Sequence, residues 1–83
     1  MITSSLDSLH PGERATIRAI NAEEGLHQRL NALGFRVGKH IELVRRARFQ
    51  GPLHVRLGTT DVILRRSEAH RIQISQEPSA ALA

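Results

Sequence analysis

The sequence contains no cysteine, tryptophan or tyrosine, and only two phenylalanines among its 83 residues. Disulfide bonds and zinc sites built on cysteine are therefore excluded. The scarcity of aromatic side chains argues against grooves that bind proline-rich peptides and against stacking platforms for single-stranded nucleic acid. No apolar run approaches the roughly 20 residues of a membrane span, so we expect no direct membrane insertion.

Motifs that carry catalysis are also missing. The chain has no Gly-x-Ser-x-Gly nucleophile elbow, no Walker A motif and no Gly-x-Gly-x-x-Gly motif. Its carboxylates are scattered singly apart from Glu23 and Glu24, whose position at a predicted helix start is explained by the helix dipole. We therefore expect a protein that is not an enzyme and that works by binding another molecule.

The length allows one domain, and its core must rest on aliphatic packing. Hydrophobic residues make up 40% of the chain and are nearly all Leu, Ile, Val and Ala. The first residues show neither the basic nor the apolar region of a secretory signal, so we expect a cytoplasmic protein. Residues 76–83 lack periodicity and predict a disordered tail, which leaves a domain at residues 1–75.

Polar and apolar residues alternate in five short segments, and this period of two predicts strands. These segments are residues 14–20, 40–46, 53–57, 61–64 and 72–74. The side chains expected to face inward are Ala15, Ile17, Ala19, Ile41, Leu43, Leu53, Val55, Leu57, Val62, Leu64, Ile72 and Ile74. Five strands of this length predict a mainly β fold, a small SH3-like barrel whose closure removes exposed sheet edges.

The period changes to a helical one after the first predicted strand. Three leucines fall at i, i+4 and i+7, on one face of a helix: Leu26, Leu30 and Leu33. Asn21 is a candidate N-cap because Glu24 follows at the spacing of a capping box. Gly34 suits the left-handed position that ends many helices. The sequence therefore predicts one helix inserted after the first strand and packed on the barrel.

The charge balance is basic, with a formal net charge of +4 and arginine as 11 of the 12 basic residues. Six of these arginines lie on or beside strands expected to meet: Arg45, Arg46, Arg48, Arg56, Arg65 and Arg66. A patch that contacts phosphates is one interpretation, which leaves a nucleic-acid-binding module as an alternative function. Ordinary exposed arginines are the other, and the scarcity of aromatics makes us expect no nucleic-acid partner.

Five histidines raise a second alternative, a carrier or sensor that binds Fe²⁺ or Zn²⁺ directly. The histidines lie on different predicted elements, and no two have the i, i+3 or i, i+4 spacing of helical metal ligands. His54 and His70 are the candidates for such a surface site. Exposed polar histidines explain the same pattern without a metal, so we expect no obligatory cofactor.

Four segments, taken together and in order, resemble the FeoA family. Residues 26–38 (LHQRLNALGFRVG) are similar to the hallmark helix and turn of that family, and residues 9–13 (LHPGE) to its opening turn. Residues 51–53 (GPL) resemble its Gly-Pro strand entry, and residues 64–72 its closing segment. The resemblance runs from about residue 6 to residue 74.

The resemblance implies an SH3-like barrel with a helical insertion and a cytoplasmic accessory role in bacterial ferrous-iron uptake. It further implies a membrane permease of the FeoB type, which carries a cytoplasmic GTPase domain, as the partner that is regulated or assembled. The hallmark residues mostly specify the fold, so the partner-binding face must be sought on the surface. We expect it on the exposed side of the helix and the following turn, at Gln28, Arg29, Arg36 and Lys39.

Overall fold

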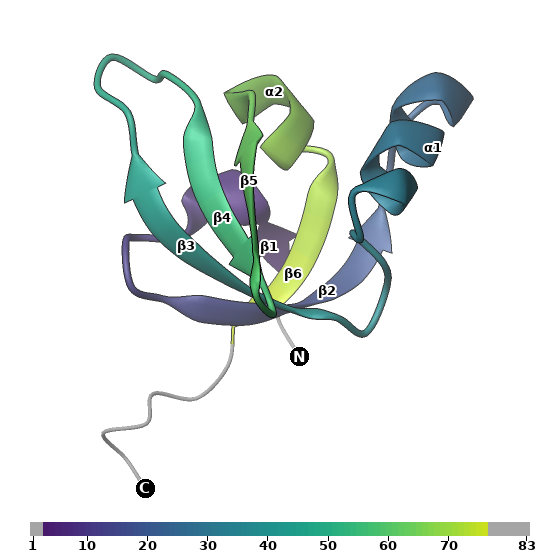
Figure 1. Cartoon of the computed structure of the whole chain (residues 1–83), viewed down its shortest axis with the longest axis horizontal. Helices are drawn as coiled ribbons and strands as arrows, with labels where there is room; N and C mark the ends of the chain where they lie inside the picture. Colours follow the sequence, from purple (N-terminus) through teal and green to yellow (C-terminus); the bar gives the residue numbers. More distant parts are fainter. Residues whose placement is uncertain (1–2, 77–83) are drawn as a thin grey trace, which may run out of the picture.

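The alternating segments form one strongly curved antiparallel sheet in the computed structural model, which describes residues 3–76 (Figure 1). The strands are β1 (Ser4–Ser5), β2 (Arg14–Ile20), β3 (His40–Arg46), β4 (Leu53–Leu57), β5 (Thr60–Leu64) and β6 (Ile72–Gln76). Their order across the sheet is β1-β6-β2-β3-β4-β5, and every neighbouring pair is antiparallel. The mainly β, SH3-like fold predicted from the sequence is confirmed.

Two details of the predicted barrel are wrong. The described residues form six strands instead of five, because the two-residue strand β1 pairs with β6 and is too short to show a period in the sequence. Within the described residues, 3–76, no hydrogen-bonded pairing of β1 with β5 closes the barrel. These two strands remain the edges of the sheet.

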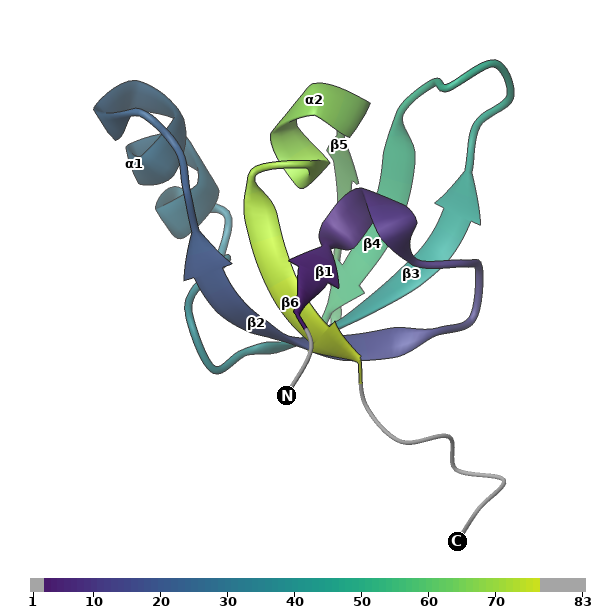
Figure 2. The same cartoon turned by 180° about the vertical axis from the view of Figure 1, so that it is seen from behind.

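Three short helices accompany the sheet: the 3₁₀ helix η1 (Leu6–Ser8), α1 (Glu24–Ala32) and α2 (Arg66–Ala69). Figures 1 and 2 show α1 standing at one side of the sheet, with α2 between α1 and the hairpin formed by β3 and β4. No helix within residues 3–76 is long and apolar enough to cross a membrane. The predicted tail lies outside the described residues, except for Gln76, which is the last residue of β6.

The core lies inside the curve of the sheet and is aliphatic, as expected. Eleven of the twelve side chains expected to face inward are buried; the exception, Ala19, is only half-buried. The pairing of β2 with β6 shifts register between Ile17 and Ala19, so the alternation is interrupted there. Leu6, Leu9 and Phe35 complete the core from η1 and the loops.

Helix α1 packs on this core through fewer residues than its leucine spacing predicts. Leu30 is its one fully buried residue and Leu26 packs at the edge, whereas Leu33 is 40% exposed. The helix ends at Ala32, so Leu33 is the C-cap and follows the packed turn. The predicted capping box is wrong, because the N-cap is Glu23 and the backbone of Asn21 instead donates to the Arg71 carbonyl.

Candidate partner-binding surface

A tight C-terminal cap fixes the end of α1 and the segment that leaves it. The Phe35 N–H donates to the Leu30 carbonyl at 2.9 Å, and the Gly34 N–H donates to the Asn31 carbonyl at 3.0 Å. Gly34 has a φ of +104°, as predicted for the residue that ends the helix. This is a Schellman motif, and the buried side chains of Phe35 and Leu30 supply its apolar contact.

The next four residues form a turn that is pinned to β2. The Lys39 N–H donates to the Arg36 carbonyl at 3.1 Å, and Gly38 supplies the positive φ of +94°. The Gly38 N–H donates to the Ile17 carbonyl at 2.8 Å, and the Ile17 N–H donates to the Lys39 carbonyl at 2.9 Å. The turn is therefore held rigidly against the sheet, and it presents Val37 to solvent with 65% of the residue exposed.

Arg29 links the two α-helices. Its guanidinium forms an ion pair with the carboxylate of Glu68 in α2, which is 13% exposed. The same carboxylate accepts a hydrogen bond from the Arg65 N–H at 2.9 Å, so it also caps the start of α2. Arg29 keeps 55% of its side chain exposed and thus combines a structural contact with access to a partner.

The other three predicted site residues are exposed, but each interacts with a different neighbour. Gln28 donates to Glu24 at 3.4 Å, one turn earlier on the outer side of α1. Arg36 donates from Nε to the Asn31 side chain at 3.2 Å, which ties the turn to the last turn of the helix. Lys39 ends the turn beside the start of β3.

Two exposed apolar residues lie among these polar ones and were not predicted as surface residues. Leu33 follows Arg29 at i+4, so the two are neighbours on the helix surface, and Val37 follows in the turn. The one sequence signal for the exposure of Leu33 is Gly34, because a helix that ends at this glycine leaves Leu33 outside its last turn. We call the whole set the α1 surface: Gln28, Arg29, Leu33, Arg36, Val37 and Lys39.

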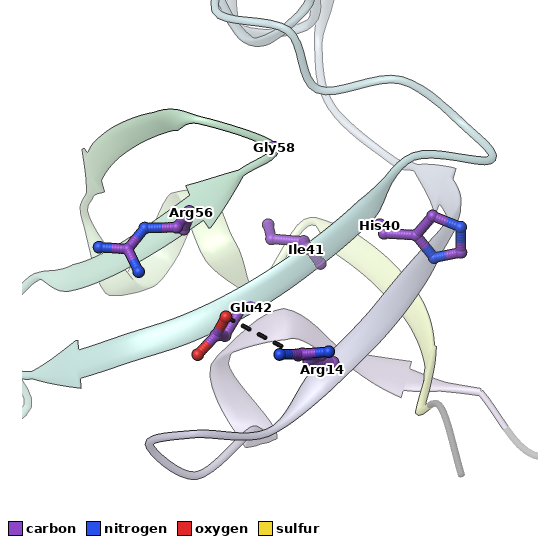
Figure 3. A pocket seen from close by; sticks show the side chains of 6 residues that line it. All are labelled: Arg14, His40, Ile41, Glu42, Arg56 and Gly58. Atoms are coloured by element: carbon purple, nitrogen blue, oxygen red, sulfur yellow. Dashed lines mark ion pairs between the residues drawn. The ribbon is translucent and has the colours of Figure 1, made fainter. Parts of the chain in front are cut away.

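A hollow of about 370 Å³ lies elsewhere, on the outer side of β2, β3 and β4 (Figure 3). It is lined by Arg14, His40, Ile41, Glu42, Arg56 and Gly58. Arg14 and Glu42 form a loose ion pair across it, with 3.8 Å between Nε and Oε1. The hollow is therefore lined mainly by polar and charged side chains.

The first predicted metal candidate, His54, belongs to a charged cluster on β4 and β5. Its Nε2 lies 2.9 Å from Oδ2 of Asp61, whose other oxygen is 2.7 Å from Nε of Arg56. Hydrogen bonds from Arg56 and then His54 lower the pKa of Asp61 from 3.8 to about 2. The cluster is an ion-pair network that joins β4 to β5.

The second candidate, His70, belongs to a separate cluster that joins α2 to η1. Its Nδ1 lies 3.2 Å from Oδ2 of Asp7, and Arg66 lies 3.8 Å from the same oxygen. Burial opposes ionisation of Asp7, but hydrogen bonds from Ser5 and His70 and the nearby positive charges lower its pKa overall. His54 and His70 thus belong to different ion-pair clusters, and residues 3–76 contain no group of three metal-ligating side chains.

Three of the six arginines considered as a phosphate patch are engaged by contacts within the fold. Arg56 and Arg66 are engaged by carboxylates, and Arg46 is directed inward, where it donates to the carbonyls of Asp7 and Leu9. The guanidinium groups of these three arginines therefore contribute to contacts within the fold. The nucleic-acid alternative gains no support from this arrangement.

Comparison with known proteins identifies the family. A model of the FeoA domain matches residues 4–76, which is nearly the whole chain. The chain belongs to the FeoA domain family. It is also 32% identical over 71 residues to Fe(2+) transport protein A of Campylobacter jejuni, and the match covers 86% of this chain and 96% of that protein.

Two further relatives bear on function. A fusion of Fe(2+) transport protein A with the Fe(2+) transporter FeoB, from Porphyromonas gingivalis, is 32% identical over 69 residues. That match covers 83% of this chain but only 8% of the fusion protein. The structure of Stenotrophomonas maltophilia FeoA complexed with zinc, a prokaryotic SH3 domain protein, is 30% identical with a TM-score of 0.78. The structural match covers 92% of this chain and 98% of the Stenotrophomonas maltophilia chain.

Proposed function

We propose that the chain is a non-enzymatic, cytoplasmic accessory protein of ferrous-iron uptake that binds the cytoplasmic part of a FeoB-type permease through its α1 surface. The observation that carries this proposal is the Porphyromonas gingivalis relative, in which the two partners are one polypeptide. Fusion of two domains in one organism supports the association of their separate counterparts in another.

The chemistry of the α1 surface supports a role in protein binding. It combines two exposed apolar side chains, Leu33 and Val37, with the cationic groups of Arg29, Arg36 and Lys39. Interfaces typically join an apolar centre to a charged rim, and arginine is enriched in them. The cap of α1 and the pinned turn keep the backbone of this surface in one conformation, so little order must be gained on binding.

A calorimetric titration of the purified chain into the isolated cytoplasmic domain of the permease tests the proposal, with and without a non-hydrolysable GTP analogue. We expect saturable one-to-one binding. Arg36→Glu reverses a charge of the α1 surface, and the double variant Leu33→Ser with Val37→Ser removes its apolar side chains. Each should weaken binding by about tenfold or more. A dependence of affinity on the GTP analogue would indicate regulation of the GTPase, whereas its absence would indicate assembly.

Arg48→Glu is the matched control, because it reverses an exposed arginine in the turn between β3 and β4, on the other side of the molecule (Figures 1 and 2). It should bind as the unmodified chain does. Arg29→Glu is less informative, since it would place two carboxylates together at Glu68 and disturb the contact between the helices. Full binding by both α1-surface variants would contradict the proposed face, and no binding by the unmodified chain would contradict the partner.

Transition-metal binding is a second candidate function, which the zinc complex of the Stenotrophomonas maltophilia relative supports. The pairs His54–Asp61 and His70–Asp7 each offer two ligands, whereas structural zinc sites use four. A zinc or Fe²⁺ titration with His54→Ala and His70→Ala separates the outcomes. One-to-one binding that is lost in either variant would support this function, and weak binding to several sites would contradict it.

A further inference from the structure

The turn between β3 and β4 carries the most exposed large hydrophobic side chain in residues 3–76. Phe49 is 97% exposed at the tip of this hairpin, which extends beyond the strands (Figure 1). Arg48 and Gln50 beside it are exposed and polar. The ring therefore stands alone in solvent, without an apolar neighbour that would shield it.

The backbone holds Phe49 in this position at a conformational cost. Phe49 and Gln50 have φ values of +57° and +60°, and the Gly51 N–H donates to the Arg48 carbonyl at 3.1 Å. Two successive residues with positive φ define a type I′ turn, which is normally built from Asn and Gly. A phenylalanine in the left-handed region is strained, and strain of this kind concentrates at functional positions.

Basic residues flank the turn along the chain. Residues 43–60 contain four arginines and no aspartate or glutamate. Arg46 is directed inward onto two backbone carbonyls, and Arg56 is held by a carboxylate. Arg45 and Arg48 are exposed, and neither forms an ion pair with a carboxylate in the described part of the chain.

We propose that this hairpin tip, defined as Arg45, Arg48 and Phe49, contacts an anionic phospholipid surface. The Phe49 ring enters the headgroup region, and the two guanidinium groups bind lipid phosphates. A lipid surface presents negative charge with an apolar layer directly behind it, which matches an aromatic ring that projects from cationic neighbours. A protein partner would instead have to enclose the ring in a pocket of its own, because Phe49 has no packed neighbours on this chain that would help to exclude water from the contact.

This contact goes beyond the proposed binding of the permease and does not require it. The tip and α1 lie on opposite sides of α2 in both views (Figures 1 and 2), so the tip leaves the α1 surface free. One phenylalanine and two arginines give weak membrane binding by themselves. The tip would then orient the chain on the cytoplasmic face of the bilayer, where a membrane transporter is found.

The absence of tryptophan and tyrosine provides the experiment, because Phe49→Trp places the only strong fluorophore at the tip. The probe is a vesicle of phosphatidylcholine mixed with phosphatidylglycerol, compared with phosphatidylcholine alone and with no permease present. We expect a blue shift, and quenching by brominated lipid, with the anionic vesicles only. Val37→Trp is the matched control, since Val37 is also exposed but belongs to the α1 surface; it should show no shift.

Sedimentation with the same vesicles measures each contribution. Phe49→Ser should lower the partition coefficient about tenfold. Arg45→Gln and Arg48→Gln should each lower it roughly fivefold, and added salt should weaken binding further. No shift of Phe49→Trp with anionic vesicles, or equal sedimentation of Phe49→Ser, would overturn the proposal. A blue shift of Phe49→Trp that appears only when the permease domain is added would also overturn the proposal, because the ring would then bind a pocket on that protein. The proposed function would stand.

Discussion

The substitution Gln50→Gly should stabilise the fold, which makes the strained hairpin turn directly measurable. Gln50 is the second central residue of the turn, with a φ of +60°. It is exposed, and no hydrogen bond of its side chain is among the contacts found in residues 3–76. Glycine adopts this conformation without a steric penalty, so the change removes strain and loses little else.

The size of the effect follows from two opposing contributions. An L-residue in the left-handed helical region costs about 1–2 kcal/mol. Glycine costs the folded state about 0.4–1 kcal/mol through the greater freedom of the unfolded chain. The midpoints of these two ranges differ by about 0.8 kcal/mol, so the free energy of unfolding should rise by roughly that amount, which corresponds to about 3–6 °C in Tm for a domain of this size.

Thermal and urea denaturation followed by far-ultraviolet circular dichroism is the suitable assay, because the chain has no tryptophan or tyrosine to report by fluorescence. Gly51→Ala is the contrasting variant in the same turn. Its added Cβ would lie 2.8 Å from Cβ of Ala47 and 3.0 Å from the Arg48 carbonyl oxygen, so it should destabilise by about 1–3 kcal/mol. A Tm for Gln50→Gly at or below that of the unmodified chain would refute the left-handed turn.

Three further predictions concern the core, the acid stability and the α1 surface. Leu30→Ala should lower the free energy of unfolding by about 2–5 kcal/mol in urea, and a loss below about 1 kcal/mol would show that α1 is not packed. The pKa of Asp61 is lowered from 3.8 to about 2, so its contribution to stability is complete above pH 4 and is lost as pH falls toward 2. Asp61→Asn should therefore lose less Tm between pH 5 and pH 2 than the unmodified chain; an equal loss would contradict the ion-pair cluster. Leu33→Ser and Val37→Ser should each change Tm only slightly, because both side chains are exposed, and a large drop in Tm would show that they are packed.

Strand positions were predictable because burial on one side of a sheet imposes a period of two. The segments at His40–Arg46 and Leu53–Leu57 agree with the predicted boundaries. Strand β1 has two residues and no period, so nothing local indicated its pairing with β6. Closure of the barrel depends on how far two distant edges approach each other, which a pattern along the chain does not encode.

The candidate site was predictable in part. Gly34 indicated where α1 ends, whereas the ion pair that Arg29 forms with Glu68 joins two distant parts of the chain and had no local signal in the sequence. The spacing of Leu33 suggested burial, but the residue follows the last helical turn and reaches solvent. Phe49 appeared in the sequence only as part of a break between strands, since the left-handed conformation that exposes it is set by the hairpin as a whole.

The measurement that tests the central claim most directly is ferrous-iron uptake in a strain from which the gene for this chain has been deleted. The unmodified chain and an Ile63→Ser control should restore uptake when expressed at equal levels, because Ile63 is 63% exposed on β5 and belongs to neither the α1 surface nor the hairpin tip. The folded double variant Leu33→Ser with Val37→Ser should fail to restore it, because the α1 surface can no longer hold the permease. Uptake that is unaffected by the deletion, or fully restored by the double variant, would contradict the account.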